Sequence, residues 1–315
     1  MSSIVTTSSF YAAANIASVS TTAIRNLSSA QFAALDTAQL AALTSDQIAA
    51  VDSKDFAALS STQVAAFTAD QAAGFEANDL KKMLAQVAYL QDEVISHLDT
   101  SIISSLSTKT IAYLSSSQVA ALSVEEVEQL TTAQLSKLGS AALAAFDSED
   151  IAALSSSQIQ GLSTAGINGI DVDAFSALST DVIAALTTKQ IAGLSSDIAE
   201  ALTETQVAAL TTTQLAKLSS VDFAMFSAED IAVMSSSQVA SLSTAALNAI
   251  DTDAFTALST DVISALTSKQ LAGLSTDLAS AMTQEQASAL QTANLLSYMG
   301  SEVAALVYGA YPDLT

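Results

Sequence analysis

An apolar residue returns every eight positions along this chain, and that spacing restricts the folds open to it. The count runs from Leu27 to Met83, takes one seven-residue step to Leu90, and then continues to Leu306 and Leu314. A period held this strictly predicts a repeat architecture, in which each unit buries its apolar face against its neighbours. Such a chain is expected to be a structural or binding protein rather than an enzyme.

Each eight-residue unit, or octad, repeats one order of residue types, whose positions we label a to h. The segment Leu114–Ala121 is a clear copy and reads LSSSQVAA, with Leu at position a and Ser at position b. Position b holds Ser, Thr or Asp, which are favoured helix N-caps, and position e often holds Gln, Glu or Asp. This spacing is that of a capping box, in which the two side chains satisfy each other's backbone N–H groups. Each octad is therefore expected to start its own helix.

Three other interpretations of the octad fit less well. In one continuous α-helix, eight residues advance by about 800°, so the Leu row would wind around the helix and face no constant side. A β-solenoid needs alternating residues, whereas QVAAL is a block of adjacent apolar ones. A disordered tract is disfavoured because half of the residues are apolar, and disorder is typical of low hydrophobicity.

The pattern therefore predicts an all-α solenoid of very short capped helices. Leu at position a and the apolar residue at position f, such as Ile48, Val64, Phe175 and Phe255, are expected to point inward. Ala at positions g and h would let neighbouring segments approach closely. Helices this short are unstable alone in water, so stacking must hold them.

The octads divide the chain into five parts. Between residues 78 and 97 the apolar positions are spaced by three and four, which predicts one longer amphipathic helix of about five turns. We expect an N-terminal cap or assembly segment (1–26), a short octad array (27–77), the longer linking helix (78–97), a long octad array (98–297) and a C-terminal cap, assembly or export segment (298–315).

A second repeat lies within the long array. Residues 130–209 align with residues 210–289 without gaps, and about 50 of the 80 positions are identical. This similarity indicates that a block of ten octads was duplicated as a whole. A solenoid tolerates such growth because the added block meets the same neighbouring surface.

Composition excludes several functions. The 315 residues carry a formal charge of −23, with only nine Lys and Arg, whereas nucleic-acid binding needs clustered cations. The chain has no Cys, so disulfides and thiolate metal sites are excluded. Ser or Thr interrupts every apolar stretch before it reaches the roughly 20 residues of a transmembrane segment. The first residues lack a basic n-region, so no cleaved N-terminal signal is expected.

Few residues are candidates for site chemistry. The pairs Asp171 and Asp173, and Asp251 and Asp253, could bind Ca²⁺, but no Gly-containing calcium loop is present and helix N-caps explain the same residues. His97 is the single histidine; with no second His or Cys it is expected to be a surface or capping residue, and a hydrolase triad has no further support. We therefore expect no enzyme activity and no cofactor, with calcium as a weak alternative.

The two ends of the chain differ from the octads in their aromatic residues. Phe10 and Tyr11 lie near the start, and Tyr298, Tyr308 and Tyr311 lie near the end. A solenoid needs caps that cover its end surfaces. These side chains could also bind a second copy head to tail, which would build an open filament. Capping and self-assembly both remain open from the sequence.

The repeat LSxxQ(I/V)AAL resembles octapeptide-repeat arrays of large bacterial proteins thought to be surface-bound or secreted. The C-terminal stretch EVAALVYGAYPDLT is similar to an uncleaved export signal of one-step bacterial secretion. The resemblance implies a location outside the cell or on its surface. It favours a non-enzymatic structural protein, a rigid acidic solenoid that assembles with itself into a filament, surface layer or matrix. The alternative is a monomeric adhesin-like module that binds calcium, glycans or other surface components.

Overall fold

The chain folds into short helices joined by tight turns. The computed structural model describes residues 13–224 and 226–314, and the chain divides into two compact units, Met1–Ile170 and Asp171–Thr315. The described residues contain no β-strand, and none of their helices has the length and apolar character needed to cross a membrane. The predicted class, an all-α solenoid of very short helices, is confirmed.

The first unit contains helices of four to seven residues, three of which are 3₁₀-helices (η). They are α2 (Ala13–Ile16), α3 (Thr21–Arg25), α4 (Ser29–Phe32), α5 (Thr37–Ala41), α6 (Ser45–Ile48), η1 (Ser53–Ala58), α7 (Ser61–Val64), η2 (Ala69–Gly74), α8 (Ala77–Met83), η3 (Leu84–Tyr89), α9 (Asp92–Ile95), α10 (Thr100–Ser105), α11 (Thr108–Ile111), α12 (Ser116–Ala120), α13 (Val124–Gln129), α14 (Thr132–Leu135), α15 (Ser140–Leu143), α16 (Ser148–Ala152), α17 (Ser156–Gly161) and α18 (Thr164–Ile167).

The second unit continues in the same manner and ends with two longer helices. They are α19 (Val172–Ser176), α20 (Thr180–Ala185), α21 (Thr188–Ile191), α22 (Ser196–Glu200), α23 (Glu204–Ala209), α24 (Thr212–Leu215), α25 (Ser220–Phe223), α26 (Ala228–Ala232), α27 (Ser236–Ser241), α28 (Thr244–Leu247), α29 (Thr252–Ala257), α30 (Thr260–Ser264), α31 (Ser268–Ala272), α32 (Thr276–Ala281), α33 (Gln284–Thr292), η4 (Leu296–Tyr298), α34 (Ser301–Ala310) and η5 (Pro312–Leu314).

Capping boxes start many of these helices, as the sequence predicts. In α12 the Ser115 hydroxyl accepts a hydrogen bond from the Gln118 N–H (3.1 Å), while Gln118 Oε1 accepts one from the Ser115 N–H (2.9 Å). The boxes predicted at Ser155, Thr203 and Ser235 are all present. Because the N-cap backbone is extended, each cap also ends the preceding helix and turns the chain.

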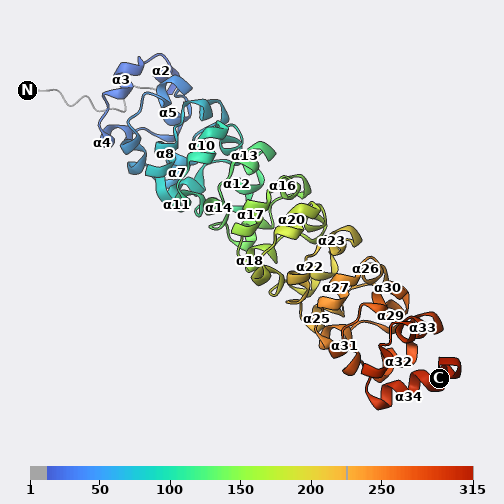
Figure 1. Cartoon of the computed structure of the whole chain (residues 1–315). Coiled ribbons are helices and arrows are strands. Elements are labelled where there is room, and N and C mark those ends of the chain that lie inside the picture. The colour runs from blue at the N-terminus through green and yellow to red at the C-terminus, as the bar shows by residue number, and fades with distance from the viewer. Residues whose placement is uncertain (1–12, 225, 315) are drawn as a thin grey trace, which may run out of the picture. The chain divides into compact units, whose positions relative to one another are not determined.

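The helices stack in a regular order within each unit. A helix packs against the helix three places further along the chain, for example α10 on α13 and α14 on α17 in the first unit, and α24 on α27 and α27 on α30 in the second. Three octads therefore complete one turn of the superhelix, and the ribbon of each unit winds in such turns (Figure 1). The sequence alone does not determine this number.

Positions a and f form the core, as predicted. Ile48, Val64, Phe175 and Phe255, all at position f, are fully buried, and most of the Leu residues at position a are buried with only a small exposed fraction. Position h is small because it lies against the previous turn: a Cβ added to Gly169 would come within 2.7 Å of Ser140 Cβ. The small residues therefore allow the close stacking that gives each short helix its neighbours.

A buried polar ladder at position e joins successive turns. Besides its capping-box role, Gln134 donates from Nε2 to the carbonyls of Ile103 and Leu106, both at 3.0 Å. The same arrangement recurs at Gln47, Gln63, Gln71, Gln118, Gln158, Gln206, Gln214, Gln238, Gln270 and Gln286. One side chain thus holds the start of its own helix through Oε1 and the end of a helix in the previous turn through Nε2.

Some octads carry an acidic residue at the ladder position. These residues are Asp55, Asp79, Glu126, Asp150, Asp222 and Asp230, and all are buried. Their carboxylates can still accept the N-cap hydrogen bond; Asp222 Oδ2, for instance, accepts from the Ser219 N–H at 3.0 Å. An ionised carboxylate has no proton to donate, so these octads lose the donor bonds to the carbonyls of the previous turn. Asp55 instead accepts a hydrogen bond from the Ser29 hydroxyl, 26 residues earlier, at 2.5 Å.

The single long helix predicted for residues 78–97 is wrong. The segment consists of α8, η3 and α9, and the chain bends at Leu84, whose φ of 54° lies in the left-handed region. In an octad, position e follows position a by four residues, position f follows e by one, and the next position a follows f by three. The octad pattern therefore contains the same steps of three and four as an amphipathic helix. Met83, Val87 and Leu90 are buried as in an octad, and η3 lies within the seven-residue step.

The array also starts earlier than the sequence pattern indicates. Helices α2 and α3 precede Leu27, and Ile16 and Ile24 are buried at the octad spacing. Gln47 Nε2 donates to the carbonyls of Ile16 (2.8 Å) and Val19 (2.6 Å), which is the usual ladder pair. The residues from Ala13 therefore belong to the stack, although position a is Val rather than Leu here.

The ladder leads to a first prediction. Gln214→Glu keeps the shape and the capping acceptor but replaces the Nε2 donor, which contacts the Ile183 and Leu186 carbonyls at 2.9 and 2.8 Å, with an oxygen. Because this buries an unpaired charge, we expect the free energy of unfolding at pH 8 to fall by about 2–4 kcal/mol in urea titrations. Gln284→Glu, at an exposed site, is the matched control and should change it little.

A second prediction concerns the core. Leu186 is buried at position a, so Leu186→Asp places an unpaired carboxylate among apolar side chains and removes their packing. We expect a loss of about 4 kcal/mol or more, with increased hydrogen exchange in α20 and its neighbours. Thr205→Asp, on the exposed surface of α23, should leave exchange unchanged; equal stability of the two variants would show that Leu186 is not a core residue.

Candidate self-assembly surface

The C-terminal residues of the second unit leave the octad pattern. Helix α33 ends at Thr292, and Asn294 follows with a φ of 57°, a left-handed conformation that Asn adopts more easily than most residues. The Leu295 N–H donates to the Leu290 carbonyl (2.8 Å) and the Asn294 N–H to the Gln291 carbonyl (2.9 Å). These two bonds form a Schellman motif, which reverses the chain after α33.

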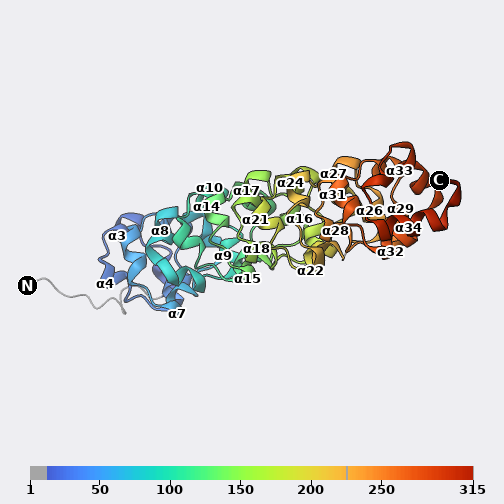
Figure 2. The same ribbon diagram turned by 60° about the horizontal axis from the view of Figure 1, so that its bottom comes forward.

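Helix α34 then folds back over the last turn of the second unit. It packs against α32, and Val303, Val307 and Leu314 are buried. The Tyr311 hydroxyl donates to the Met282 carbonyl at 2.6 Å, and Gln291 Nε2 donates to the Leu314 carbonyl at 2.6 Å. Both ribbon views place α32, α33 and α34 together at the C-terminal end of this unit (Figures 1 and 2). The C-terminal segment therefore packs on the last octads of the unit, and we refer to it as the cap.

The cap uses the three C-terminal tyrosines differently. Tyr311 is half-buried and tied to the fold by its hydroxyl. Tyr308 is half-buried and lines a small hollow of about 170 Å³ together with Gln291, Asn294, Leu296 and Ser297. Tyr298 is 51% exposed, so it alone of the three presents most of its ring to solvent. The other two predicted residues, Phe10 and Tyr11, lie outside the described residues.

Leu306 adds a second exposed apolar side chain to this end. It is 39% exposed although the eight-residue count places it at the buried position a. The count fails because α33 and α34, with nine and ten residues, no longer return to the core after one octad. In the sequence, this change is signalled by the missing Ser or Thr caps. We refer to these two exposed apolar residues, Tyr298 of η4 and Leu306 of α34, as the end patch.

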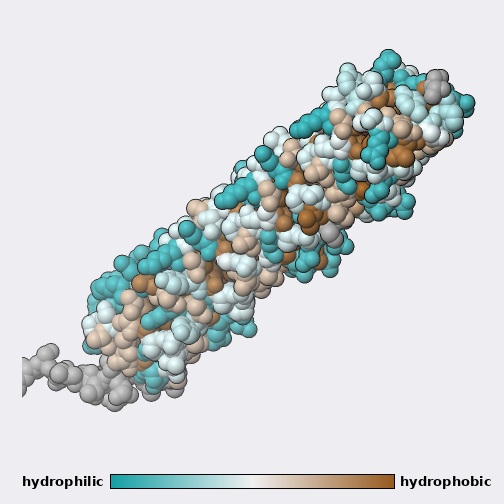
Figure 3. Space-filling view, turned by 90° about the horizontal axis from the view of Figure 1, so that it is seen from below, coloured by the Kyte–Doolittle hydropathy of each residue, from teal (hydrophilic) through white to brown (hydrophobic). Residues whose placement is uncertain are grey.

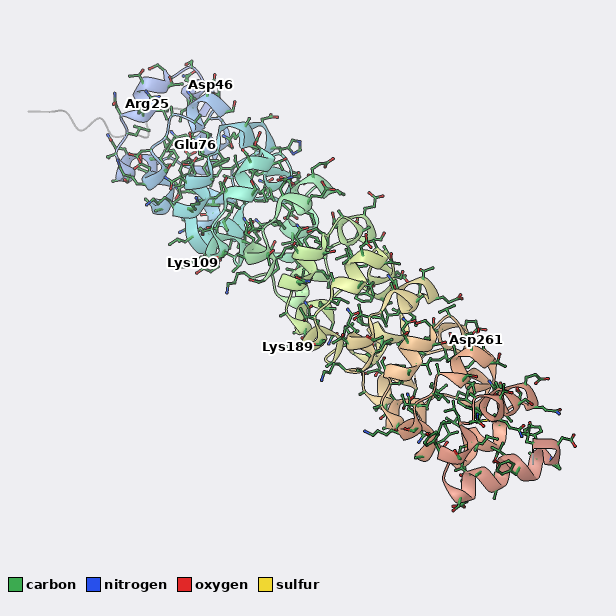
Figure 4. The ribbon with its side chains drawn as sticks, in the orientation of Figure 1. Arg25, Asp46, Glu76, Lys109, Lys189 and Asp261 are labelled. Carbon is green, nitrogen blue, oxygen red and sulfur yellow. The ribbon has the colours of Figure 1, made fainter. Side chains whose placement is uncertain are left out.

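Charged side chains lie on the outside of both units. The six labelled residues in Figure 4, Arg25, Asp46, Glu76, Lys109, Lys189 and Asp261, are all exposed. Figure 3 shows apolar areas, in brown, between more polar residues on the face it presents. The excess of acidic residues keeps such surfaces in solution and repels copies that approach without a specific contact.

The aspartate pairs serve as helix caps. Asp171 accepts hydrogen bonds from the Asp173 and Ala174 N–H groups, and Asp251 accepts one from the Asp253 N–H. Among the described residues no group of three or more His, Cys, Asp or Glu side chains is arranged to hold a metal ion. The capping interpretation therefore accounts for both pairs.

His97 also has a local role. Its Nδ1 lies 2.8 Å from the Glu93 carbonyl and 3.2 Å from the Ser96 hydroxyl, at the C-terminal end of α9. A ring N–H that donates to a terminal carbonyl satisfies one of the groups that a helix leaves without a partner. This placement agrees with the surface or capping role predicted for it.

One acidic hollow lies on the side of the second unit. It has a volume of about 460 Å³ and is formed by Val172, Asp173 and Ser176 from α19 and by Asp197, Glu200 and Ala201 from α22. Its three carboxylates surround a small apolar floor. Such a surface favours cations over anions, but its shape is open rather than enclosed.

Comparison with known proteins supports the repeat architecture. A family described as the ALTTAQ repeat matches residues 13–45, 127–164 and 223–268. The first match begins at Ala13 of α2, the first residue that the structure describes. No curated protein matches the chain. The chain is thus a repeat protein similar to the ALTTAQ repeat in three regions.

The cap leads to a third prediction. Tyr311→Phe removes only the hydroxyl that binds the Met282 carbonyl, so the cap should loosen by about 1 kcal/mol. Hydrogen exchange of residues 301–314 should become faster, while exchange in α24–α30 stays the same. Tyr298→Phe is the matched control because its ring is exposed. Equal exchange in both variants would contradict a capping role for the Tyr311 hydroxyl.

Proposed function

We propose that this protein is a non-enzymatic structural subunit that self-associates through its ends into an extracellular filament, surface layer or matrix. The observation that supports it most is the end patch. Tyr298 and Leu306 remain exposed on a cap whose other apolar residues, Val303 and Val307, are buried. Burying such side chains against a second copy would be favourable at about 25 cal/mol for each Å² of apolar surface.

The internal structure suits such a role. Packing repeats from turn to turn and ladder bonds recur along both units, so length is gained by adding octads without designing a new core. When two copies meet through different surfaces, each copy keeps one of the two surfaces free for a further copy. Such head-to-tail contacts build open polymers unless the rotation between copies closes a ring. The similarity to secreted and surface octapeptide-repeat arrays supports a location outside a bacterial cell.

The alternative is a binding module that stays monomeric. The acidic hollow between α19 and α22 favours it, because three carboxylates around an apolar floor suit a cationic group. In that case the repeats would present ligand sites along their surface, as in an adhesin or a calcium- or glycan-binding protein.

The fourth prediction tests self-assembly directly. Negative-stain electron microscopy and light scattering of the full-length protein, with and without Ca²⁺, should show polymers. The double variant Tyr298→Ser and Leu306→Ser should lose them and keep its helical circular dichroism. Tyr311 is unsuited to this test because its hydroxyl holds the cap.

The control variant is Val221→Ser, whose side chain is 63% exposed on α25, away from the end patch. It should polymerise like the unchanged protein. Single particles under all conditions would contradict self-assembly and favour the binding module. Polymers that persist in the double variant would show that another surface makes the contact.

A further inference from the structure

In most octads whose ladder position is polar, the residue there is Gln. In the octad of α13 it is Glu126. Its Oε2 accepts hydrogen bonds from the Ser123 N–H (2.8 Å) and hydroxyl (3.2 Å), so half of the carboxyl group works as a capping box. Its Oε1 is buried without a hydrogen-bond partner, and the residue is 2% exposed. A buried polar atom without a partner is costly, and more so when it carries charge.

The ladder shows what this oxygen faces. Gln118 and Gln134, one octad before and after, each donate to the carbonyls 31 and 28 positions back. The same offsets from Glu126 lead to the carbonyls of Ile95 and Leu98. Carbonyl oxygens only accept, so an ionised Oε1 adds a further acceptor here. A protonated Oε1 instead supplies one donor at this place, where Nε2 of Gln supplies two.

The surrounding charges disfavour the ionised form. Helix α13 packs against α10 and α16, and these three helices contain no Lys or Arg. Their ionisable groups and caps, apart from Glu126, are Glu125, Glu128, Asp99, Asp147, Glu149 and Asp150. Beside the two acceptor carbonyls stand Asp92 and Glu93 of α9 and the exposed ring of His97. Glu126 therefore has carboxylates around it and no permanent cation.

We propose that Glu126 binds a proton in the folded protein and donates it in a hydrogen bond to one of the two carbonyls, that of Ile95 or that of Leu98. The first unit then carries a proton-binding site that restores one of the two ladder bonds on acidification. Acid would tighten this part of the stack, whereas acid commonly loosens proteins whose carboxylates are paired. This role is independent of self-assembly.

The direction of the pKa shifts agrees with this proposal. Burial is the main influence on Glu126 and raises its pKa above the ordinary value, while the Ser123 hydrogen bonds lower it to a smaller extent. Burial likewise raises the pKa of Asp150, at the ladder position of α16, to about 6. A carboxyl group with a raised pKa binds more protons when folded, so its contribution is complete below the unfolded pKa and is lost as pH rises through the folded pKa.

The pH window follows from these values. For Asp150 it runs from 3.8 to about 6, and for Glu126 it starts at the ordinary 4.5 and extends upward. The free energy of unfolding of the first unit should therefore fall as pH rises through this range.

The fifth prediction uses Glu126→Gln in the full-length protein. The variant restores the common ladder residue, so it should fold. At pH 8 its melting temperature should exceed that of the unchanged protein by about 3 °C or more. Amide exchange in 95–98 and 123–129, corrected for intrinsic rates, should be slower. At pH 4.5 both differences should disappear, because Glu126 then carries its own proton.

Two control variants separate this site from general effects. Glu128→Gln, exposed on the same helix, makes the same change in net charge and should not reproduce the gain. His97→Gln removes the imidazole beside the acceptor carbonyls and should preserve the pH dependence. Infrared spectra should show a protonated carboxyl band that Glu126→Gln removes and Glu128→Gln keeps. Equal stability and exchange of Glu126→Gln and Glu128→Gln at pH 8, or a gain that persists at pH 4.5, would overturn the proposal.

Discussion

The structure depends on one side chain at position e, the glutamine that bonds in two directions. Helices of four to six residues cannot form alone, because nucleation costs more than so few hydrogen bonds return. Gln134 stabilises such short helices in two ways. Its Oε1 fixes the first turn of its own helix, and its Nε2 binds the carbonyls of Ile103 and Leu106 at the end of an earlier one. One side-chain amide group thus provides both the local signal that starts a helix and the long-range contact that joins it to an earlier turn.

The sequence predicted what is local and periodic. The helical class, the capping boxes and the buried positions a and f follow from residue types at fixed spacing, as Ser115 and Gln118 illustrate. The number of octads in a turn did not follow, because it depends on how neighbouring turns meet. The second role of Gln was missed for the same reason: its acceptors lie 28 to 31 residues back.

Two segments of the chain show the limits of the pattern. Apolar spacing of three and four in residues 78–97 fits an amphipathic helix and an octad equally well, and the left-handed φ of Leu84 decides between them. At the C-terminus the count continues through Leu306, while α33 and α34 grow longer and expose that residue. A repeat count gives burial only while the helix lengths stay constant. The candidate site depends on that change, so the sequence located Tyr298 but not Leu306.

The ladder also has a direction along the chain. In every described ladder bond the donor is the later residue and the acceptor the earlier one, as from Gln286 back to Phe255 and Leu258. During synthesis, the surface that each helix needs has therefore left the ribosome before the helix itself. The protein can form from its N-terminus one octad at a time, each new octad docking on a completed turn. Such stepwise growth keeps few apolar residues exposed at any moment, however many octads the chain contains.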